Sequence, residues 1–263
     1  MKKLLALLLA LTLCWAPLAI AEETPTLTFG ETQAPAEETE APAETAEPAE
    51  EPEAALPLTG VIIGIDPGHQ EHQNKEQEAV APGSSETKKK CSSGTEGRVT
   101  HVAEYVVNLD VSLQLRDALE ALGCTVVMTR TANDVDISNQ ERAKMMNEAG
   151  VDLWLRVHCD GSESSSEKNG ISMYVCETGD TAEESYRAGE CLVDAMCEAT
   201  GAKNRGVTRT DAYTGNNWSE RPCVLVEMGY MSNAEEDARL NTPSYQAELV
   251  EGMVNGIRAF VGK

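Results

Sequence analysis

The chain of 263 residues is poor in aromatic and histidine side chains and has no excess of positive charge. Aromatic residues make up 4% of it, and histidine occurs four times. Its formal net charge at pH 7 is −23. Because such a chain offers no basic face to a phosphate backbone, we exclude nucleic acid as a partner. Beyond the N-terminal region, no apolar run is long enough to cross a membrane.

The N-terminal region has the three parts of a secretory signal. Lys2 and Lys3 precede an apolar core over residues 4–13, and Ala19-Ile20-Ala21 forms a small-x-small cleavage site. Cys14 follows a leucine, whereas lipoprotein signals place Gly, Ala or Ser before the modified cysteine. We therefore predict a signal peptide over 1–21, secretion, no lipid anchor and no membrane insertion after cleavage.

Residues 22–56 differ in composition from the rest of the chain. They are rich in Glu, Ala, Pro and Thr, with 11 acidic residues and no basic one. Such a segment buries too little apolar surface to offset its ordering entropy, so we predict a disordered acidic linker. The remaining residues, 57–263, suit one domain, with 19 basic and 33 acidic residues and a net charge of −14.

The cysteines do not form a recognisable framework. Of the eight in the chain, Cys14 falls in the predicted signal peptide, which leaves seven. An odd number in a secreted chain means at least one free thiol or an intermolecular bridge. Neither the number nor the spacing is typical of a small disulfide scaffold or a zinc knuckle.

Short β-rich runs alternate with amphipathic segments along the domain. We expect strands near 61–65, 124–128, 152–158, 171–176 and 223–226, helices near 102–122, 138–149, 181–200, 233–240 and 243–261, and loops over 70–100 and 201–222. Ser138 and Glu141 have the spacing of a capping box. This alternation predicts an α/β fold: a single layered domain with a mostly parallel, mixed central sheet flanked by helices.

Two of the histidines and one glutamate close predicted strands. His69 follows the strand near 61–65, His158 ends the strand near 152–158, and Glu227 follows the strand near 223–226. If these strands are parallel, the three side chains converge on one edge of the sheet, where α/β enzymes place their chemistry. Taken singly, His69 also suits a polar turn, and Glu227 suits a buried ion pair.

A hydrolytic zinc site needs three protein ligands, an open fourth position and a carboxylate base. The two histidines supply imidazoles, and Glu104, in the first turn of the helix near 102–122, supplies a second carboxylate beside Glu227. Glu104 alone also suits a partner for the helix dipole. The spacing of these residues is too wide to form a compact motif, so the residues alone leave these alternatives open.

Other polar residues have weaker claims. We expect surface roles for His72 and His101, and a turn or supporting role for Asp66. Cys159 adjoins His158, but neighbours on a strand point to opposite faces, so a thiol nucleophile is disfavoured. Residues 216–218, Asn-Asn-Trp, either line the cleft or pack in the core.

Seven short stretches together resemble the zinc-dependent N-acetylmuramoyl-L-alanine amidases of the amidase 3 type, over about residues 61–262. They are Ile65-Asp-Pro-Gly-His69, Ala103-Glu-Tyr-Val-Val-Asn-Leu109, Val127-Met-Thr-Arg130, Ser138-x-x-x-Arg142, Val157-His158, Arg205-Gly206 and Val226-Glu-Met-Gly-Tyr-Met-Ser-Asn233. The resemblance implies one Zn²⁺ ion held by His69, Glu104 and His158, with Glu227 as the catalytic glutamate. It also implies cleavage of the amide between the muramoyl lactyl group and L-alanine in peptidoglycan. We expect a monomer, although no motif in the sequence sets the oligomeric state.

The chain departs from that pattern near two of the implied ligands. Gln70-Glu71 stands where the family often has Gly-Gly, and Arg156-Val-His-Cys-Asp160 replaces the usual Ser-Ile-His-Ala-Asn. The 70–100 loop is long, and we expect it to set substrate preference, although its basic cluster over 88–90 is typical of a solvated loop. Two other functions stay open: a non-catalytic wall-binding protein, and a zinc peptidase that cuts within the stem peptide.

Overall fold

The computed structural model describes residues 55–263, so the predicted signal peptide and nearly all of the predicted linker lie outside it. A six-stranded sheet with the order β4-β1-β5-β8-β6-β7 forms its centre. The strands are β1 (Ile62–Pro67), β4 (Thr125–Met128), β5 (Leu153–Asp160), β6 (Ile171–Val175), β7 (Asn204–Arg209) and β8 (Cys223–Tyr230). The first four in this order are parallel, β6 is antiparallel to β8, and β7 is parallel to β6. The predicted mixed α/β sheet is confirmed.

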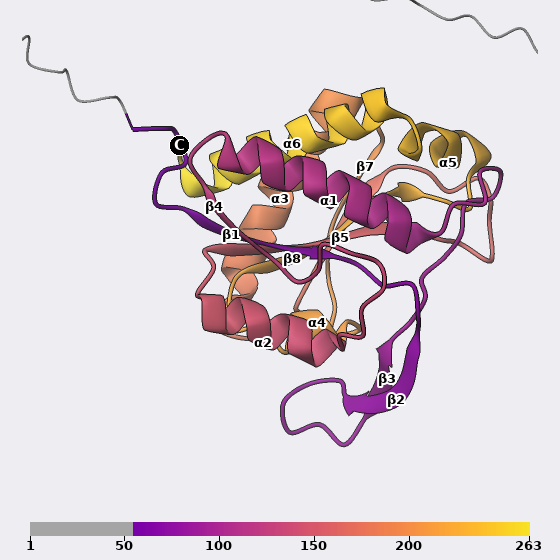
Figure 1. Cartoon of the computed structure of the whole chain (residues 1–263), viewed down its shortest axis with the longest axis horizontal. Coiled ribbons are helices and arrows are strands. Elements are labelled where there is room, and N and C mark those ends of the chain that lie inside the picture. Colours follow the sequence, from indigo (N-terminus) through magenta and orange to yellow (C-terminus); the bar gives the residue numbers. More distant parts are fainter. Residues whose placement is uncertain (1–54) are drawn as a thin grey trace, which may run out of the picture. The chain divides into compact units, whose positions relative to one another are not determined.

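Helices cover both faces of this sheet (Figure 1). They are α1 (Glu104–Glu120), α2 (Asn139–Ala149), α3 (Ala182–Thr200), α4 (Thr214–Asn217), α5 (Ala234–Leu240) and α6 (Pro243–Val261). Helices α1, α3 and α6 lie on one face, and α2 and α4 lie on the other. Within the described part, none of the helices is both long and apolar enough to cross a membrane.

The larger apolar core lies between the sheet and the face that carries α1, α3 and α6. Val111, Leu115 and Leu119 of α1 are fully buried there beside Ile63 and Leu155 of the sheet. Burying each aliphatic side chain of this size stabilises the fold by about 1.5–3 kcal/mol. The smaller core, on the α2 face, is formed by Ala143, Met146, Val151, Trp154 and Cys223. Apolar cores thus pack against both faces of the sheet and hold its strands in place.

Helix α2 begins at the capping box that the sequence predicts. Ser138 accepts a hydrogen bond from the Glu141 amide, and the Glu141 carboxylate accepts one from the Ser138 amide at 2.8 Å. The helix ends at Gly150, which adopts the left-handed conformation with φ 63°. These two ends place Arg142, one turn into the helix, below the end of β1.

The structure corrects three sequence-based predictions about secondary structure. The predicted 70–100 loop contains a hairpin of β2 (Asn74–Ala79) and β3 (Thr87–Cys91), whose charged and polar residues gave no strand pattern. The predicted 201–222 loop contains the edge strand β7 and the short helix α4, because β7 is half exposed and lacks an apolar alternation. Strands β5 and β8 also run past His158 and Glu227, which therefore lie within strands rather than at their ends.

Candidate metal and catalytic site

His69 lies just after β1 and has a left-handed backbone conformation, unlike the extended residues of the strand. Its φ is 59°, in the left-handed region that residues with a Cβ seldom adopt. Two buried arginines hold the carbonyl oxygens around it: Arg130 donates to Pro67 and Gly68, and Arg142 donates to Pro67 and His69. Position 68 requires glycine, because a Cβ there would overlap the His158 imidazole. The turn thus brings the two histidine rings together.

A buried carboxylate anchors this turn from below. Asp66 forms ion pairs with Arg142 at 2.6 Å and with Arg156 at 3.0 Å, and Thr129 donates a hydrogen bond to it at 2.7 Å. Burial alone would raise the pKa of Asp66, but the two guanidinium groups and these hydrogen bonds hold that pKa well below its usual range. Asp66 therefore supports the site and is not part of it, as the sequence suggested.

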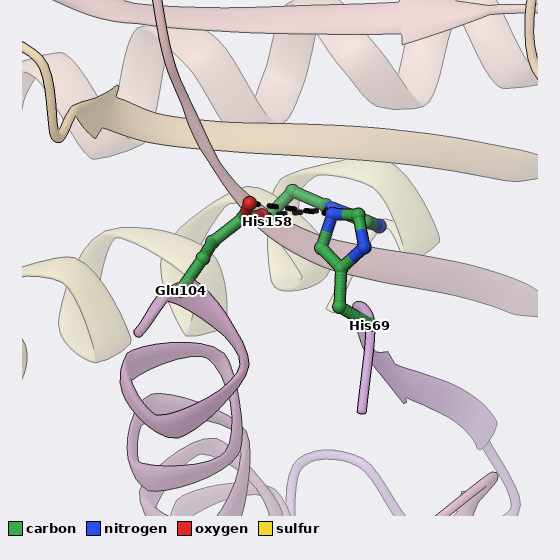
Figure 2. Close-up of side chains that lie close together, drawn as sticks. All are labelled: His69, Glu104 and His158. Carbon is green, nitrogen blue, oxygen red and sulfur yellow. Dashed lines mark hydrogen bonds and ion pairs between the residues drawn. The ribbon is translucent and has the colours of Figure 1, made fainter. Parts of the chain in front are cut away.

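Glu104 joins the two histidines (Figure 2). Its Oε2 lies 3.3 Å from His69 Nε2, and its Oε1 lies 3.1 Å from His158 Nδ1. The histidine rings stand edge to face with their centroids 4.7 Å apart. One ligand atom from each of the three side chains falls within 4.8 Å of the others. The structure thus brings together the three residues expected as ligands, from β5, the start of α1 and the turn after β1.

Backbone groups fix the Glu104 carboxylate in place. Its Oε2 accepts a hydrogen bond from the Thr95 amide at 2.9 Å, and its Oε1 accepts one from the Cys159 amide at 3.1 Å. Asn108, one turn along α1, donates another to Oε1 at 3.1 Å. Gly94 has φ 76°, and a Cβ there would press against both Glu104 and His69. The side chain is therefore oriented for binding at the site rather than for capping the helix.

The two histidines differ in their affinity for protons. Burial would lower the pKa of His69, but the neighbouring Glu104 carboxylate outweighs burial and raises that pKa above its usual value. Burial dominates at His158 and lowers its pKa to about 4. Burial would raise the pKa of Glu104, but His69 and His158 hold it well below the usual range. At neutral pH, therefore, Glu104 is ionised and His158 is neutral, which are the forms that bind metal.

The donor set fits a metal ion. His69 Nδ1 lies 2.9 Å from the carbonyl oxygen of Ser92, which fixes a ring proton on Nδ1, so Nε2 is the nitrogen that faces Glu104 and the cluster. Within residues 55–263, the buried atoms His158 Nε2 and Glu227 Oε2 have no hydrogen-bond partner. Two imidazoles and one carboxylate are the ligands of many catalytic zinc sites, and orphaned polar atoms call for a bound group.

Glu227 faces the same cavity from the neighbouring strand. It lies opposite His158 in the register of the parallel pair β5 and β8. Burial raises the pKa of Glu227 well above its usual range, and the charges of Glu104 and Asp160 raise it further. A cavity of about 420 Å³ is lined by Glu227 and by the His69, Glu104 and His158 cluster. A carboxylate with high proton affinity beside a potential metal site is suited to proton transfer.

The remaining candidates lie elsewhere. His72 is exposed, and His101 is exposed beside Glu96. Cys159 is buried, and burial raises the pKa of its thiol well above the usual value, so it offers no thiolate nucleophile. Trp218 packs against the smaller core and donates to the Ala79 carbonyl at 2.9 Å.

The sequence missed several residues that complete the site. Residues 216–218 do not line the cavity, but their predecessors Ala212, Tyr213 and Thr214 do. Ser92, Gly94 and Thr95 lie in the predicted 70–100 loop and hold His69 and Glu104 through backbone atoms. The glycines and serines of that loop were the one signal of a tight approach of the backbone.

The chain is similar to known cell-wall amidases. The family model described as N-acetylmuramoyl-L-alanine amidase (Amidase_3) matches residues 63–259. "N-acetylmuramoyl-L-alanine amidase LytC" of Bacillus subtilis is 30% identical over 200 residues, which cover 76% of this chain and 35% of that protein. "Probable cell wall amidase LytH" of Staphylococcus aureus is 28% identical over 78% of this chain and 60% of that protein. The chain thus spans about a third of LytC and three fifths of LytH.

Solved structures agree with this assignment. The amidase Ami1 of Mycobacterium smegmatis superposes with a TM-score of 0.72 and 25% identity, covering 78% of this chain and 98% of that one. An N-acetylmuramoyl-L-alanine amidase of Clostridium difficile 630, 20% identical, shares the fold with a TM-score of 0.66, covering 77% of this chain and 97% of that one. The match to the family model covers most of the described domain and includes His69, Glu104, His158 and Glu227. The chain therefore belongs to the amidase 3 family of N-acetylmuramoyl-L-alanine amidases.

Proposed function

We propose that this chain is a zinc-dependent hydrolase that cleaves the amide between the muramoyl lactyl group and L-alanine in peptidoglycan. The observation that carries the proposal is the cavity itself. It combines two imidazoles and a carboxylate within 4.8 Å with a second, buried carboxylate that has no partner among residues 55–263. Membership of the amidase 3 family supports the choice of bond.

Each residue of the cavity has a part in this reaction. His69, Glu104 and His158 would hold one zinc ion, which supplies Lewis-acid activation of water and of the substrate carbonyl. Glu227 acts as the general base through Oε2, the oxygen without a partner, and takes a proton from the attacking water. It then returns that proton to the leaving amine, so the peptide departs with a free amino terminus. The Ser92 carbonyl keeps the His69 proton on Nδ1 throughout.

The proposal includes where the enzyme acts. A signal peptide over 1–21, predicted from the sequence, would export the chain, and the acidic residues 22–56 would separate the domain from the processed N-terminus. Two relatives are named as amidases of the cell wall or of its muramoyl amide, which supports a location at or outside the wall.

The substitution Glu227→Gln tests the proposed base. We expect hydrolysis of purified peptidoglycan, measured as released amino termini, to fall by about 10²–10⁴-fold, while zinc binding measured by metal analysis is retained. The matched control is Glu198→Gln on the exposed side of α3, which should leave both quantities unchanged. Undiminished hydrolysis by Glu227→Gln would rule out this assignment.

Product analysis separates the proposed function from its alternatives. Mass spectrometry of digests should show intact stem peptides beginning at L-alanine, and a chelator should abolish their release. Shortened peptides would instead identify a peptidase that cuts within the stem. Binding to peptidoglycan with no cleavage by the zinc-loaded chain would identify a wall-binding protein.

A further inference from the structure

The cavity wall outside the four central residues carries positive charge. Lys88 and Lys89 of β3 and Arg156 of β5 line it, and within the described part of the chain its only acidic lining residues are Glu104 and Glu227. The domain around it has a net charge of −14 over residues 57–263. Three cations at one cavity of such an acidic domain therefore need an explanation, because a solvated surface would not concentrate them there.

Lys88 has no acidic partner within residues 55–263, because the carboxylate opposite it on the hairpin binds the start of α2 instead. It lies opposite Glu78 in the pairing of β2 with β3. The Glu78 carboxylate, however, accepts hydrogen bonds from the amides of Asn139 and Gln140 at the start of α2, at 3.1 and 3.2 Å. The Lys88 ammonium donates to the Ala212 carbonyl at 2.7 Å, across the cavity mouth. Lys90, by contrast, pairs with Glu76 at 2.7 Å and does not line the cavity.

Arg156 supplies a fixed cation at the floor. Its guanidinium donates to Asp66 at 3.0 Å, to Asn216 at 3.2 Å and to Asn139 at 2.8 Å, so it cannot swing away. A guanidinium has five N–H groups, and these three bonds leave two of them free. Asp66 is shared with Arg142, so one carboxylate is the ion-pair partner of two buried arginines. A fixed guanidinium in a cavity is well suited to bind a carboxylate.

We propose that Lys88 and Arg156 form a subsite for a carboxylate of the stem peptide, next to the amide that is cleaved. This inference rests on the proposed function. In that substrate the sugars and the lactyl amide are uncharged, so free carboxylates belong to the peptide beyond the alanine. Lys89 adds to the positive potential of the same wall. The subsite makes the enzyme select stem peptides whose side carboxylates are free rather than amidated.

The test uses two soluble muramyl peptides that differ only at the residue after L-alanine, as carboxylate or carboxamide. With the full, zinc-loaded chain we expect kcat/KM to favour the carboxylate form by about tenfold, through KM, because charge-assisted hydrogen bonds add affinity of this order. The substitution Lys88→Gln should reduce this ratio to about two to three. The control Lys75→Gln, on β2 of the same hairpin and outside the cavity, should keep the full ratio.

A binding measurement keeps this inference distinct from the proposed function. Calorimetry with the Glu227→Gln variant gives the Kd of both peptides without turnover, and it should show the same tenfold preference and the same loss with Lys88→Gln. Raising the salt concentration should weaken the preference, since Lys88 is exposed. Equal affinity for the two peptides would overturn the carboxylate subsite and leave the amidase proposal standing. Preferential binding with no hydrolysis by the wild type would overturn the amidase proposal and support the subsite.

Discussion

Two buried clusters of charged and polar residues lie near the turn after β1, and they differ in whether their polar atoms have hydrogen-bond partners. In the Asp66 cluster, both carboxylate oxygens have partners: Arg142 and Thr129 donate to one, and Arg156 donates to the other. In the candidate metal cluster, formed by His69, Glu104, His158 and Glu227, two buried atoms have no hydrogen-bond partner within residues 55–263. They are His158 Nε2 and Glu227 Oε2. Buried polar atoms are almost always satisfied, so the first cluster acts as scaffold, whereas the second has the unpaired atoms expected of a binding site.

The two buried carboxylates show the same contrast in their protonation. Burial acts on both, but the arginines hold the pKa of Asp66 well below its usual range. At Glu227 burial is reinforced by the charges of Glu104 and Asp160, and its pKa rises well above the usual range. Asp66 therefore stabilises the fold as an anion, whereas Glu227 is retained at a cost to stability. This difference is the one expected if Glu227 is the proposed base and Asp66 is part of the scaffold.

Removing the Asp66 carboxylate tests the scaffold side of the comparison. We expect Asp66→Asn to lower the free energy of unfolding by about 3–5 kcal/mol, because it leaves two buried arginines without their counter-charge. Denaturant unfolding measures this change. The control Asp117→Asn breaks an exposed pair with Arg116 and should cost less than about 1 kcal/mol.

The loss of stability in Asp66→Asn should depend on pH. The folded pKa of Asp66 is depressed, so its stabilisation is present above the unfolded value of 3.8 and is lost as pH falls through the folded pKa. The difference in stability between wild type and Asp66→Asn should therefore shrink below about pH 4. A loss that stays the same in acid, or one as small as that of Asp117→Asn, would show that the arginines do not depend on this carboxylate.

In the zinc-free chain, the pKa values of His69 and His158 should be shifted in opposite directions from the usual value. NMR titration should place the pKa of His69 above 6.5 and that of His158 near 4, a separation caused by the Glu104 carboxylate and by burial. His69 then stabilises the folded state below pH 6.5, and this contribution is lost as pH rises through its folded pKa. His158 has the opposite effect, because the unfolded chain binds its proton more tightly between pH 6.5 and about 4.

A single substitution separates the effect of the Glu104 carboxylate on these pKa values from the effect of burial. Glu104→Gln removes the carboxylate and should lower the pKa of His69 below that of the wild type, while zinc binding is lost. Coincident titration of both histidines near 6.5 would contradict the buried, coupled cluster. Assignment of the resonances follows from His69→Gln and His158→Gln, each of which removes one of the four histidine signals of the chain.

The same comparison explains how far the sequence predicts the structure. The alternation of short β-rich runs with amphipathic helices predicts the layered α/β fold, and the capping box at Ser138 predicts the start of α2. Both depend on neighbours along the chain. His69, Glu104 and His158 were predicted from strand ends, from the place of one helix and from family resemblance, and the structure brings all three together.

What the sequence did not predict depends on contacts between distant segments. The supporting role of Asp66 was expected, but its partner Arg142 lies 76 residues away, and no local pattern marks that pair. The hairpin β2 and β3 consists mostly of charged and polar residues, as a solvated loop does, yet Glu78, Asn139 and Trp218 attach it to the domain. The backbone atoms of Ser92 and Thr95, which orient His69 and Glu104, carry no residue-type signal at all.

Stability measurements on Glu227→Gln test the chemical side of the comparison. At pH 7 to 8 and without zinc, we expect the variant to be more stable than wild type by about 1–3 kcal/mol, since it removes a buried carboxyl group whose ionised form has no partner. The gain should grow as pH rises above 4.5, because a raised folded pKa means that stability is lost on ionisation. A variant that is less stable at every pH would place Glu227 with the scaffold.

The smallest expected effect lies at the helix that delivers Arg142. Ser138→Ala removes one half of the capping box of α2 and should lower the free energy of unfolding by about 1 kcal/mol. Thr181 is the matched control, because its side chain makes no capping hydrogen bond at the start of α3, so Thr181→Ala should change stability by much less. If Ser138→Ala also weakens zinc binding, the scaffold transmits strain to His69 through Arg142. If zinc affinity is unchanged, the ion pairs to Asp66 hold the turn on their own.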